Sequence, residues 1–204
     1  ATMGAAKMLR AYCYMSQPTR DYKAAEQDLK DITQMNYGLL DSYEAVFNPA
    51  NKNSKESIFE VQYLEDGSNA GVHNDIPWRL IPKCSNNDFL MGITFSNYAG
   101  TSGGWCVPTE EMIQSYEPGD QFTCEAVKTV SDFTPTTGKN FYYFIRKYYH
   151  PPYQYAGRAG DNFPVYRYAG ALLLLAENLV AQNRNVEALP YINEVRTRAG
   201  LESL

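Results

Sequence analysis

Apolar residues recur every three or four positions near the N-terminus, on both sides of a proline. The positions are Ala5, Met8, Leu9, Tyr12 and Cys13 and, after Pro18, Tyr22, Ala25, Leu29 and Ile32. Because a helix turns once in 3.6 residues, this spacing places each set on one helical face. Asp21 is a suitable N-cap for the second helix, and Asn36 and Gly38 favour its end. Residues 1–36 are therefore predicted to form a helical hairpin.

The same spacing returns near the C-terminus. The positions are Val165, Tyr168, Ala169, Leu172, Ala176 and Leu179, then Ala188, Ile192, Val195 and Ala199. They predict a second helical hairpin over residues 163–204, closed by Gly200. Pro190 removes a backbone donor, so the last helix is expected to start near Ala188 or to bend there. Asp21-Tyr22 and Asn185-Val186 then hold equivalent places in two hairpins, a repeat typical of tetratricopeptide-like folds.

Residues 37–162 follow a different pattern. Phe59, Val61 and Tyr63 alternate with polar residues, which predicts a half-buried strand, and residues 141–149 form an aromatic strand candidate. Stretches rich in Gly, Asn and Ser cover 66–74 and 96–104. Long loops of this kind within a compact domain usually carry function. The predicted fold class is mainly α: tetratricopeptide-like helical hairpins with a long loop-rich insertion that contains short strands.

Composition narrows the possible partners. The 204 residues, 44% of them hydrophobic, suffice for a substantial core and are treated as a single segment. Eighteen basic and 23 acidic residues give a formal net charge of -5, without a long run of one sign, which argues against nucleic acid as a partner. The longest apolar run, 169–176, is shorter than the roughly 18 residues of a membrane-spanning helix.

Two linked motifs near the C-terminus resemble a known family. Residues 161–177 read DNFPVYRYAGALLLLAE and residues 187–201 read EALPYINEVRTRAGL. They are similar to the signature of the SusD/RagB proteins, a helix of the form RYAxxxLxxAE followed by ALxxINxVRxRAGL. Further similarity occurs in the same order at 5–14, 21–25, 37–39, 56–60, Gly104-Trp105, Pro108-Thr109 and Gly119-Asp120.

The resemblance implies a place and a role. SusD/RagB proteins are lipid-anchored on the outer surface of Bacteroides-group bacteria, where they cover a SusC-like TonB-dependent outer-membrane transporter. They capture oligosaccharides for import and do not cleave them, and their fold is a SusD-like α-α superhelix. They are usually more than twice as long as this chain. We therefore expect an internal fragment of such a protein, with the lipid anchor outside it.

The ligand site is expected on the insertion. A pyranose ring presents an apolar C–H face and a rim of hydroxyls, so it needs a flat aromatic ring with polar groups at the edges. Trp78 on a loop with Asn74, Asp75 and Arg79 fits this requirement best, although packing of Trp78 against the helices is an alternative. Tyr63, Tyr98 and Trp105 are further ligand-binding candidates, each with a packing alternative of its own.

Other chemistry finds little support in the sequence. A glycosidase needs two carboxylates facing each other, and the adjacent Glu110 and Glu111 point to different sides of a helix, where they resemble first-turn acids. Four dispersed cysteines and two distant histidines predict no metal site, and no cofactor is expected. Arg196 and Arg198 are expected to pair with helix carboxylates such as Glu177 or with loop carbonyls.

Two alternatives stay open from the sequence. The hairpins would also serve a helical-repeat scaffold that binds a protein or a peptide. The long aromatic insertion over residues 48–162 favours glycan capture over this scaffold, because a pure solenoid has no need of such an insertion. Alternatively, the family is right and the cargo is a nutrient other than a glycan.

Overall fold

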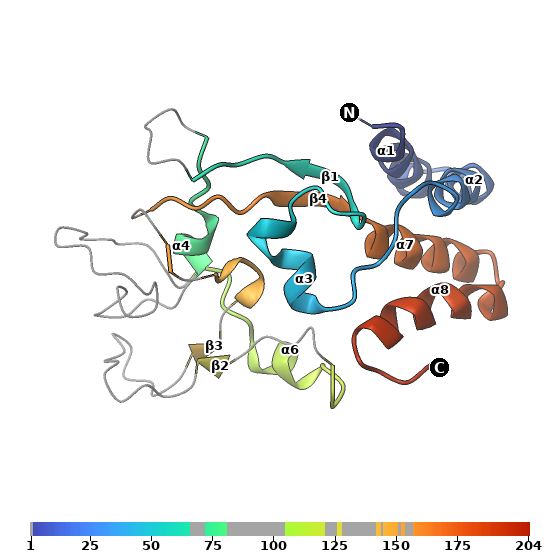
Figure 1. Ribbon diagram of the computed structural model, residues 1–204. Helices are drawn as coiled ribbons and strands as arrows, with labels where there is room; N and C mark the ends of the chain where they lie inside the picture. The colour runs from blue at the N-terminus through green and yellow to red at the C-terminus, as the bar shows by residue number, and fades with distance from the viewer. Residues whose placement is uncertain are drawn as a thin grey trace.

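Four helices form an array at one side of the molecule (Figure 1). The computed structural model describes residues 2–65, 72–80, 105–120, 126–127, 142–143, 145–150, 152–153 and 157–204. The four helices are α1 (Met3–Ser16), α2 (Tyr22–Thr33), α7 (Tyr168–Ala181) and α8 (Asn185–Arg198). They pack in chain order, α1 on α2, α2 on α7 and α7 on α8. Two hairpins that are distant in sequence therefore share one core, and the insertion between them lies to the other side.

Small side chains allow the helices of this array to approach closely. The fully or nearly fully buried residues include Ala11, Ala25, Ala171, Ala176 and Ala188, with Met8, Leu29, Ile32, Leu172, Leu175 and Leu179 filling the space between them. Burial of these apolar side chains is the main favourable term in holding the array together.

The buried stripe of α1 differs from the prediction. Ala5 and Met8 are buried as expected, but Leu9 is 56% exposed and Tyr12 and Cys13 also reach solvent. The tight approach explains the shift: a Cβ on Gly4 would lie 2.5 Å from the Tyr37 hydroxyl. Gly4 and Ala11 are therefore the buried residues on this face of α1, where larger side chains would not fit. Tyr12 instead stacks on Tyr166 at the edge of the helix array, with 5.9 Å between ring centres.

The helix ends are set locally. The Asp21 side chain accepts a hydrogen bond from the Ala24 N–H at 3.0 Å, which confirms the predicted N-cap. Gly200 follows the last helix with a φ of 85°, a conformation that glycine adopts readily. The expected start near Ala188 is wrong, because α8 begins at Asn185 and continues through Pro190.

A two-stranded antiparallel sheet joins the two ends of the insertion. Its strands are β1 (Ser57–Val61), which the alternating pattern predicts, and β4 (Phe163–Arg167). The placement of Val165 in a helix is therefore wrong. Pro164 favours an extended residue before it and donates no backbone hydrogen bond, and β1 supplies a pairing partner, so the helix begins only at Tyr168.

Short elements make up the rest of the described insertion. They are α3 (Tyr43–Phe47), the 3-10 turns η1 (Pro49–Asn51) and η2 (Arg146–Tyr148), α4 (Ile76–Leu80), α6 (Glu110–Gln114), β2 (Ala126–Val127) and β3 (Tyr142–Tyr143). The predicted strand at 141–149 thus contains a two-residue strand and a 3-10 turn. Glu110 and Glu111 lie in the first turn of α6, as expected. None of the helices in the described ranges is long and apolar enough to cross a membrane.

A buried carboxylate ties the insertion to the helix array. Glu56 accepts hydrogen bonds from Arg167 at 2.8 Å, from Arg198 at 2.7 Å and from the Leu40 N–H at 2.8 Å, and its side chain is only 2% exposed. The predicted pairing of Arg196 with a loop carbonyl is confirmed, since it donates to Glu202 O at 2.9 Å. The carboxylates that hold Arg198 and Arg196 are Glu56 and Glu117, which lie on the insertion and not on a helix.

Candidate functional site

An exposed tryptophan and an arginine share one contact on the insertion. The Arg79 guanidinium carbon lies 4.8 Å from the centre of the Trp105 ring. The Trp105 N–H also donates to the Arg79 carbonyl at 3.0 Å, so backbone and side chain hold the two residues together. Trp105 is 54% exposed. A broad aromatic surface is thus presented to solvent in a fixed orientation.

Asp75 completes this patch. Its carboxylate accepts a hydrogen bond from Arg79 Nε at 2.8 Å, and Arg79 Nη2 contacts the same oxygen. The two residues are four positions apart, the spacing of neighbours on a helix surface. Hydrogen bonding to Asp75 raises the pKa of Arg79 further above its already high value. Both side chains are partly exposed, at 43% and 49%, and the Arg79 guanidinium lies over the face of the Trp105 ring. We call Asp75, Arg79 and Trp105 the Trp105 patch.

Trp78 lies underneath and not on the surface. It is 1% exposed, its Nε1–H points to the Arg158 carbonyl at 3.5 Å, and its ring centre is 6.0 Å from that of Tyr153. Trp78 is therefore a packing residue within the insertion, which favours the packing alternative over direct contact with a ligand. The reason is tertiary: Tyr153 and the Arg158 carbonyl contact the ring from a distant part of the sequence, which the residues around Trp78 do not reveal.

Asn74 is also part of the support. Its N–H donates to the Ala159 carbonyl at 2.9 Å and its carbonyl accepts from the Ala159 N–H at 2.8 Å. The side chain donates to Asp161 O at 2.7 Å and accepts from the Ile76 N–H at 2.7 Å, and the residue is 3% exposed. Asn74 therefore fixes the start of α4 to residues 159–161, and a ligand would not reach its amide.

The remaining two candidates are placed elsewhere. Tyr63 is half-buried beyond the end of β1, where its N–H donates to Asn162 Oδ1 at 2.9 Å and its carbonyl accepts from Lys52 Nζ at 2.7 Å. Tyr98 lies outside the described residues. The sequence candidates thus separate into an exposed group (Asp75, Arg79, Trp105) and a supporting group (Asn74, Trp78).

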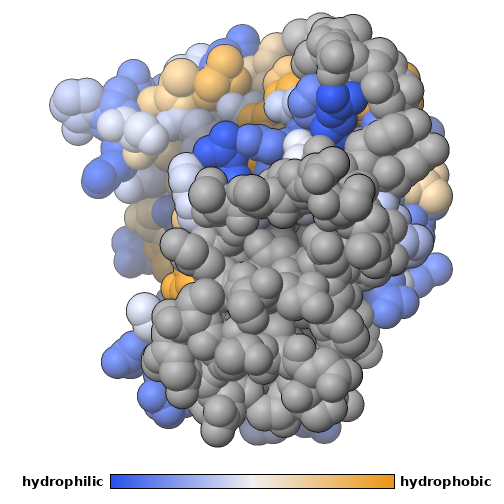
Figure 2. Space-filling view, turned by 90° about the vertical axis from the view of Figure 1, so that its left-hand side faces the viewer, coloured by the Kyte–Doolittle hydropathy of each residue, from blue (hydrophilic) through white to orange (hydrophobic). Residues whose placement is uncertain are grey.

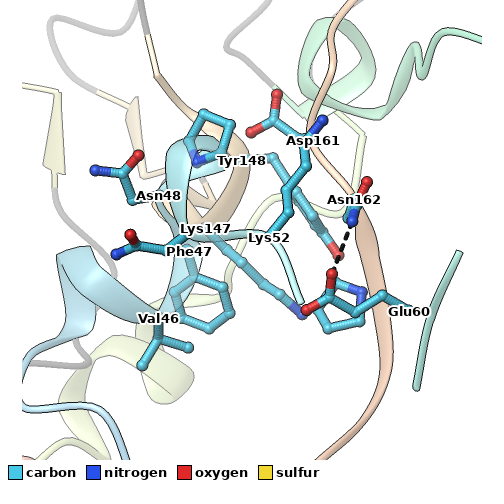
Figure 3. Close-up of a pocket in the computed structure, with 12 residues that line it drawn as sticks. Val46, Phe47, Asn48, Lys52, Glu60, Lys147, Tyr148, Asp161 and Asn162 are labelled. Carbon is cyan, nitrogen blue, oxygen red and sulfur yellow. Dashed lines mark hydrogen bonds between the residues drawn. The ribbon is translucent and has the colours of Figure 1, made fainter. Parts of the chain in front are cut away.

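A small hollow on the insertion was not predicted (Figure 3). It has a volume of about 30 Å³ and is lined by Val46, Phe47, Asn48, Pro49, Asn51, Lys52, Glu60, Lys147, Tyr148, Asp161, Asn162 and Pro164. Asn162 donates to Glu60 at 2.7 Å across one side of it. These residues come from both ends of the insertion, so no local motif in the sequence could have indicated the hollow.

Polar and apolar groups adjoin on this side of the molecule. In Figure 2, which faces the insertion, hydrophilic and hydrophobic side chains of the described residues lie next to one another along the upper part. Within the described ranges, no group of three or more His, Cys, Asp or Glu residues is placed to hold a metal ion. The chemistry available at the Trp105 patch is stacking on an aromatic ring and hydrogen bonding at its rim.

Fold and site together define a mainly helical, tetratricopeptide-like protein that displays an aromatic patch on an irregular insertion. Comparison with known proteins shows which family this chain resembles. Residues 128–204 match the model of the SusD family, whereas a search of the curated proteins finds no match. The predicted SusD/RagB resemblance is thereby confirmed in sequence over residues 128–204, and a solved SusD superfamily structure shares the fold along the length of the chain.

Solved structures agree along the whole chain. A SusD superfamily protein from Parabacteroides distasonis matches with a TM-score of 0.74 and 26% identity, over 100% of this chain and 45% of that chain. Surface glycan-binding protein A from Bacteroides thetaiotaomicron matches with 0.77 and 22%, over 100% and 48%. The same protein in complex with laminarihexaose gives 0.75 and 22%, over 100% and 49%. This chain therefore spans about half the length of the structures it matches.

Proposed function

We propose that this chain captures an oligosaccharide without cleaving it, and that the Trp105 patch contacts a sugar ring. The observation that carries the proposal is the exposed Trp105 ring, fixed by Arg79, whose guanidinium is in turn held by the Asp75 carboxylate. The laminarihexaose complex of a structural neighbour supports this class of ligand. The proposal covers ligand-binding roles for Asp75, Arg79 and Trp105, with Asn74 and Trp78 as their support.

The patch meets the physical requirements of a sugar. The apolar C–H face of a pyranose stacks on an indole ring, and removal of both surfaces from water is favourable by about 25 cal/mol per Å² of apolar area. Arg79 and Asp75 provide donors and acceptors for hydroxyl groups at the edge of the ring. Because backbone and side-chain contacts already fix Trp105, little conformational entropy is lost on binding.

The proposal extends to the setting that the family implies. The protein would be held at the outer surface of the outer membrane by a lipid anchor. It would pass its cargo to a SusC-like TonB-dependent transporter, with the sugar held on the insertion and the helices as scaffold. Within this proposal the carboxylate of Asp75 binds hydroxyl groups and takes no part in hydrolysis.

The test is native affinity electrophoresis of the purified chain in gels that contain laminarin or another polysaccharide from a panel. Trp105→Ala should abolish retardation and Trp105→Phe should retain part of it, because a smaller ring still stacks. Leu173→Ala, at a 45% exposed position of α7, is the control and should migrate like the parent. Reducing sugar should not accumulate during incubation.

Free migration of the folded parent on every glycan would overturn the proposal. A peptide-binding scaffold or a non-glycan cargo would then be the better interpretation. Retardation that is equal for the parent and Trp105→Ala would place sugar binding away from the Trp105 patch, and release of reducing sugar would contradict a non-catalytic role.

A further inference from the structure

Lys147 brings a positive charge to the hollow of Figure 3, between aromatic rings. Its Nζ lies 5.2 Å from the ring centre of Phe47 and 5.0 Å from that of Tyr148. The Arg167 guanidinium also lies over Phe47, at 5.1 Å, so two cations share one ring. Cation–π contacts stabilise a charge but do not neutralise it.

Lys147 has no counter-ion in the part of the chain that the structure describes. Among the described residues, its ammonium group contacts only the rings of Phe47 and Tyr148. Burial, and secondly the charge of Arg167, lower the pKa of Lys147 from its usual 10.5 to about 8. No carboxylate within the described ranges raises this pKa again. Arg167, by contrast, has Glu56 as its partner at 2.8 Å.

The two carboxylates that line the hollow are already engaged. Glu60 accepts from Asn162 Nδ2 at 2.7 Å and from the Asn53 N–H at 3.2 Å. Asp161 lies 2.6 Å from His150 Nδ1. The second lysine of the hollow, Lys52, donates to a backbone carbonyl. Among the described residues, neither lysine of the hollow has a carboxylate partner, and Lys147 differs from Lys52 in having ring contacts in place of a hydrogen-bond acceptor.

The size of the hollow limits what can pair with Lys147. A water molecule requires a cavity of roughly 10–15 Å³. The hollow, at about 30 Å³, therefore admits a group of two or three non-hydrogen atoms. A whole sugar ring is too large, whereas a carboxylate that projects from a ring fits. The exposed residues Asn48 and Asn51 lie on the lining and can face the remainder of such a ring outside.

We propose that the hollow binds the carboxylate of an acidic sugar, and that the cargo is therefore a uronate-containing oligosaccharide. This inference rests on the proposed capture of oligosaccharides and names their class. A carboxylate at Lys147 completes a charge-assisted hydrogen bond inside a partly desolvated site, where such bonds are stronger than in water. A neutral sugar offers no group that would neutralise the ammonium.

The experiment follows the Lys147 side chain directly. The chain is labelled with lysine carrying ¹³C at Cε, and the resonance of Lys147 is assigned by its loss in Lys147→Met. D-glucuronate and D-glucose are titrated separately at constant ionic strength, with sodium chloride as the ionic control. Glucuronate should shift the Lys147 resonance in a saturable manner and raise its pKa by about one unit, because an anion favours the charged form.

Glucose and chloride should leave Lys147 unchanged, and the exposed Lys23 should not respond to any of the three. In affinity electrophoresis, Lys147→Met should weaken retention on polygalacturonate about tenfold, as expected for loss of about 1.4 kcal/mol. Carboxyl-reduced polygalacturonate should retain the parent and Lys147→Met equally. Equal responses of Lys147 to glucuronate and glucose, or to glucuronate and chloride, would overturn the inference.

Failure of this inference is separable from failure of the proposed function. Retention that depends on Trp105 with no response of Lys147 to glucuronate leaves sugar capture in place and removes the acidic class. A response of Lys147 to glucuronate without Trp105-dependent retention supports the hollow as a carboxylate site and removes the Trp105 patch from sugar binding.

Discussion

The Trp105 backbone N–H donates to the carbonyl of Arg79, the residue that follows Trp78, at 3.0 Å. Two tryptophans with opposite environments are thus attached to the same short helix, α4. Trp78 is enclosed and Trp105 is open, at 1% and 54% exposure. The buried ring fixes the helix from which the exposed ring is presented. Substitution of one should therefore affect folding, and substitution of the other should affect binding.

Trp78→Ala should lower the free energy of unfolding by about 3–5 kcal/mol, the usual cost of removing a large buried aromatic ring. Trp105→Ala should change it by less than about 1 kcal/mol, because its ring is largely hydrated already. Urea denaturation of both variants measures the difference. Equal losses of stability would contradict the separation of the two roles.

Glu56→Gln should be among the most destabilising single changes in the chain. The carboxylate holds Arg167 and Arg198 in a site where it is 2% exposed, so its neutralisation leaves two guanidinium groups together without a counter-charge. Breaking a buried pair in this way costs about 3–5 kcal/mol. Denaturation midpoints of Glu56→Gln and of Glu177→Gln, an exposed helix position, provide the comparison. A midpoint for Glu56→Gln within the error of Glu177→Gln would refute this account.

The parts of the fold that depend on neighbours in sequence were predictable. The Asp21 cap and the helix end at Gly200 need a few adjacent residues, and β1 follows from its own alternation. Strand β4 was assigned to a helix because its character depends on pairing with β1, whose residues are distant in sequence. Short-range periodicity contains no information on such a partner.

In the candidate site, too, features with a local sequence signal were predictable and features without one were not. The polar neighbours of Trp78 correctly indicated that Asp75 and Arg79 are at the surface, yet the same context concealed the burial of Trp78 itself. Trp78 packs against Tyr153 and contacts the Arg158 carbonyl, both distant in sequence, and the hollow beside Lys147 is assembled from both ends of the insertion. Neither arrangement has a local signal, since each depends on how the insertion folds back.

Acid should weaken the contact between α2 and the turn that joins α7 to α8, at the carboxylate of Glu26. Burial acts to raise the pKa of Glu26, but hydrogen bonds from Lys30, Gln182 and Arg184 outweigh it and lower the value to about 2, from 4.5. A lowered pKa adds stability that is present above pH 4.5 and is lost as the pH falls toward 2. Between these limits the parent should lose stability more steeply than Glu26→Gln, measured as denaturation midpoints against pH. Parallel curves would contradict the role of Glu26.

Base should have the opposite effect at Lys147. Its pKa is about 8 in the folded chain and near 10.5 when unfolded, so between these values the unfolded state binds the additional proton. Stability contributed at this site should therefore rise with pH from about 8 to 10.5, by about 1–3 kcal/mol. Lys147→Met has no charge to remove, so it should lack the rise and should be more stable than the parent at neutral pH.

The measurement is the difference in free energy of unfolding between the parent and Lys147→Met across this pH range, because subtraction cancels the titration of tyrosines and other lysines. Lys23→Met, which removes an exposed lysine, should follow the parent at every pH. A difference that stays constant would mean that the pKa of Lys147 is the same in the folded and the unfolded chain. The ammonium would then be hydrated or paired in the folded chain, and the hollow would hold no desolvated charge for an acidic sugar to neutralise.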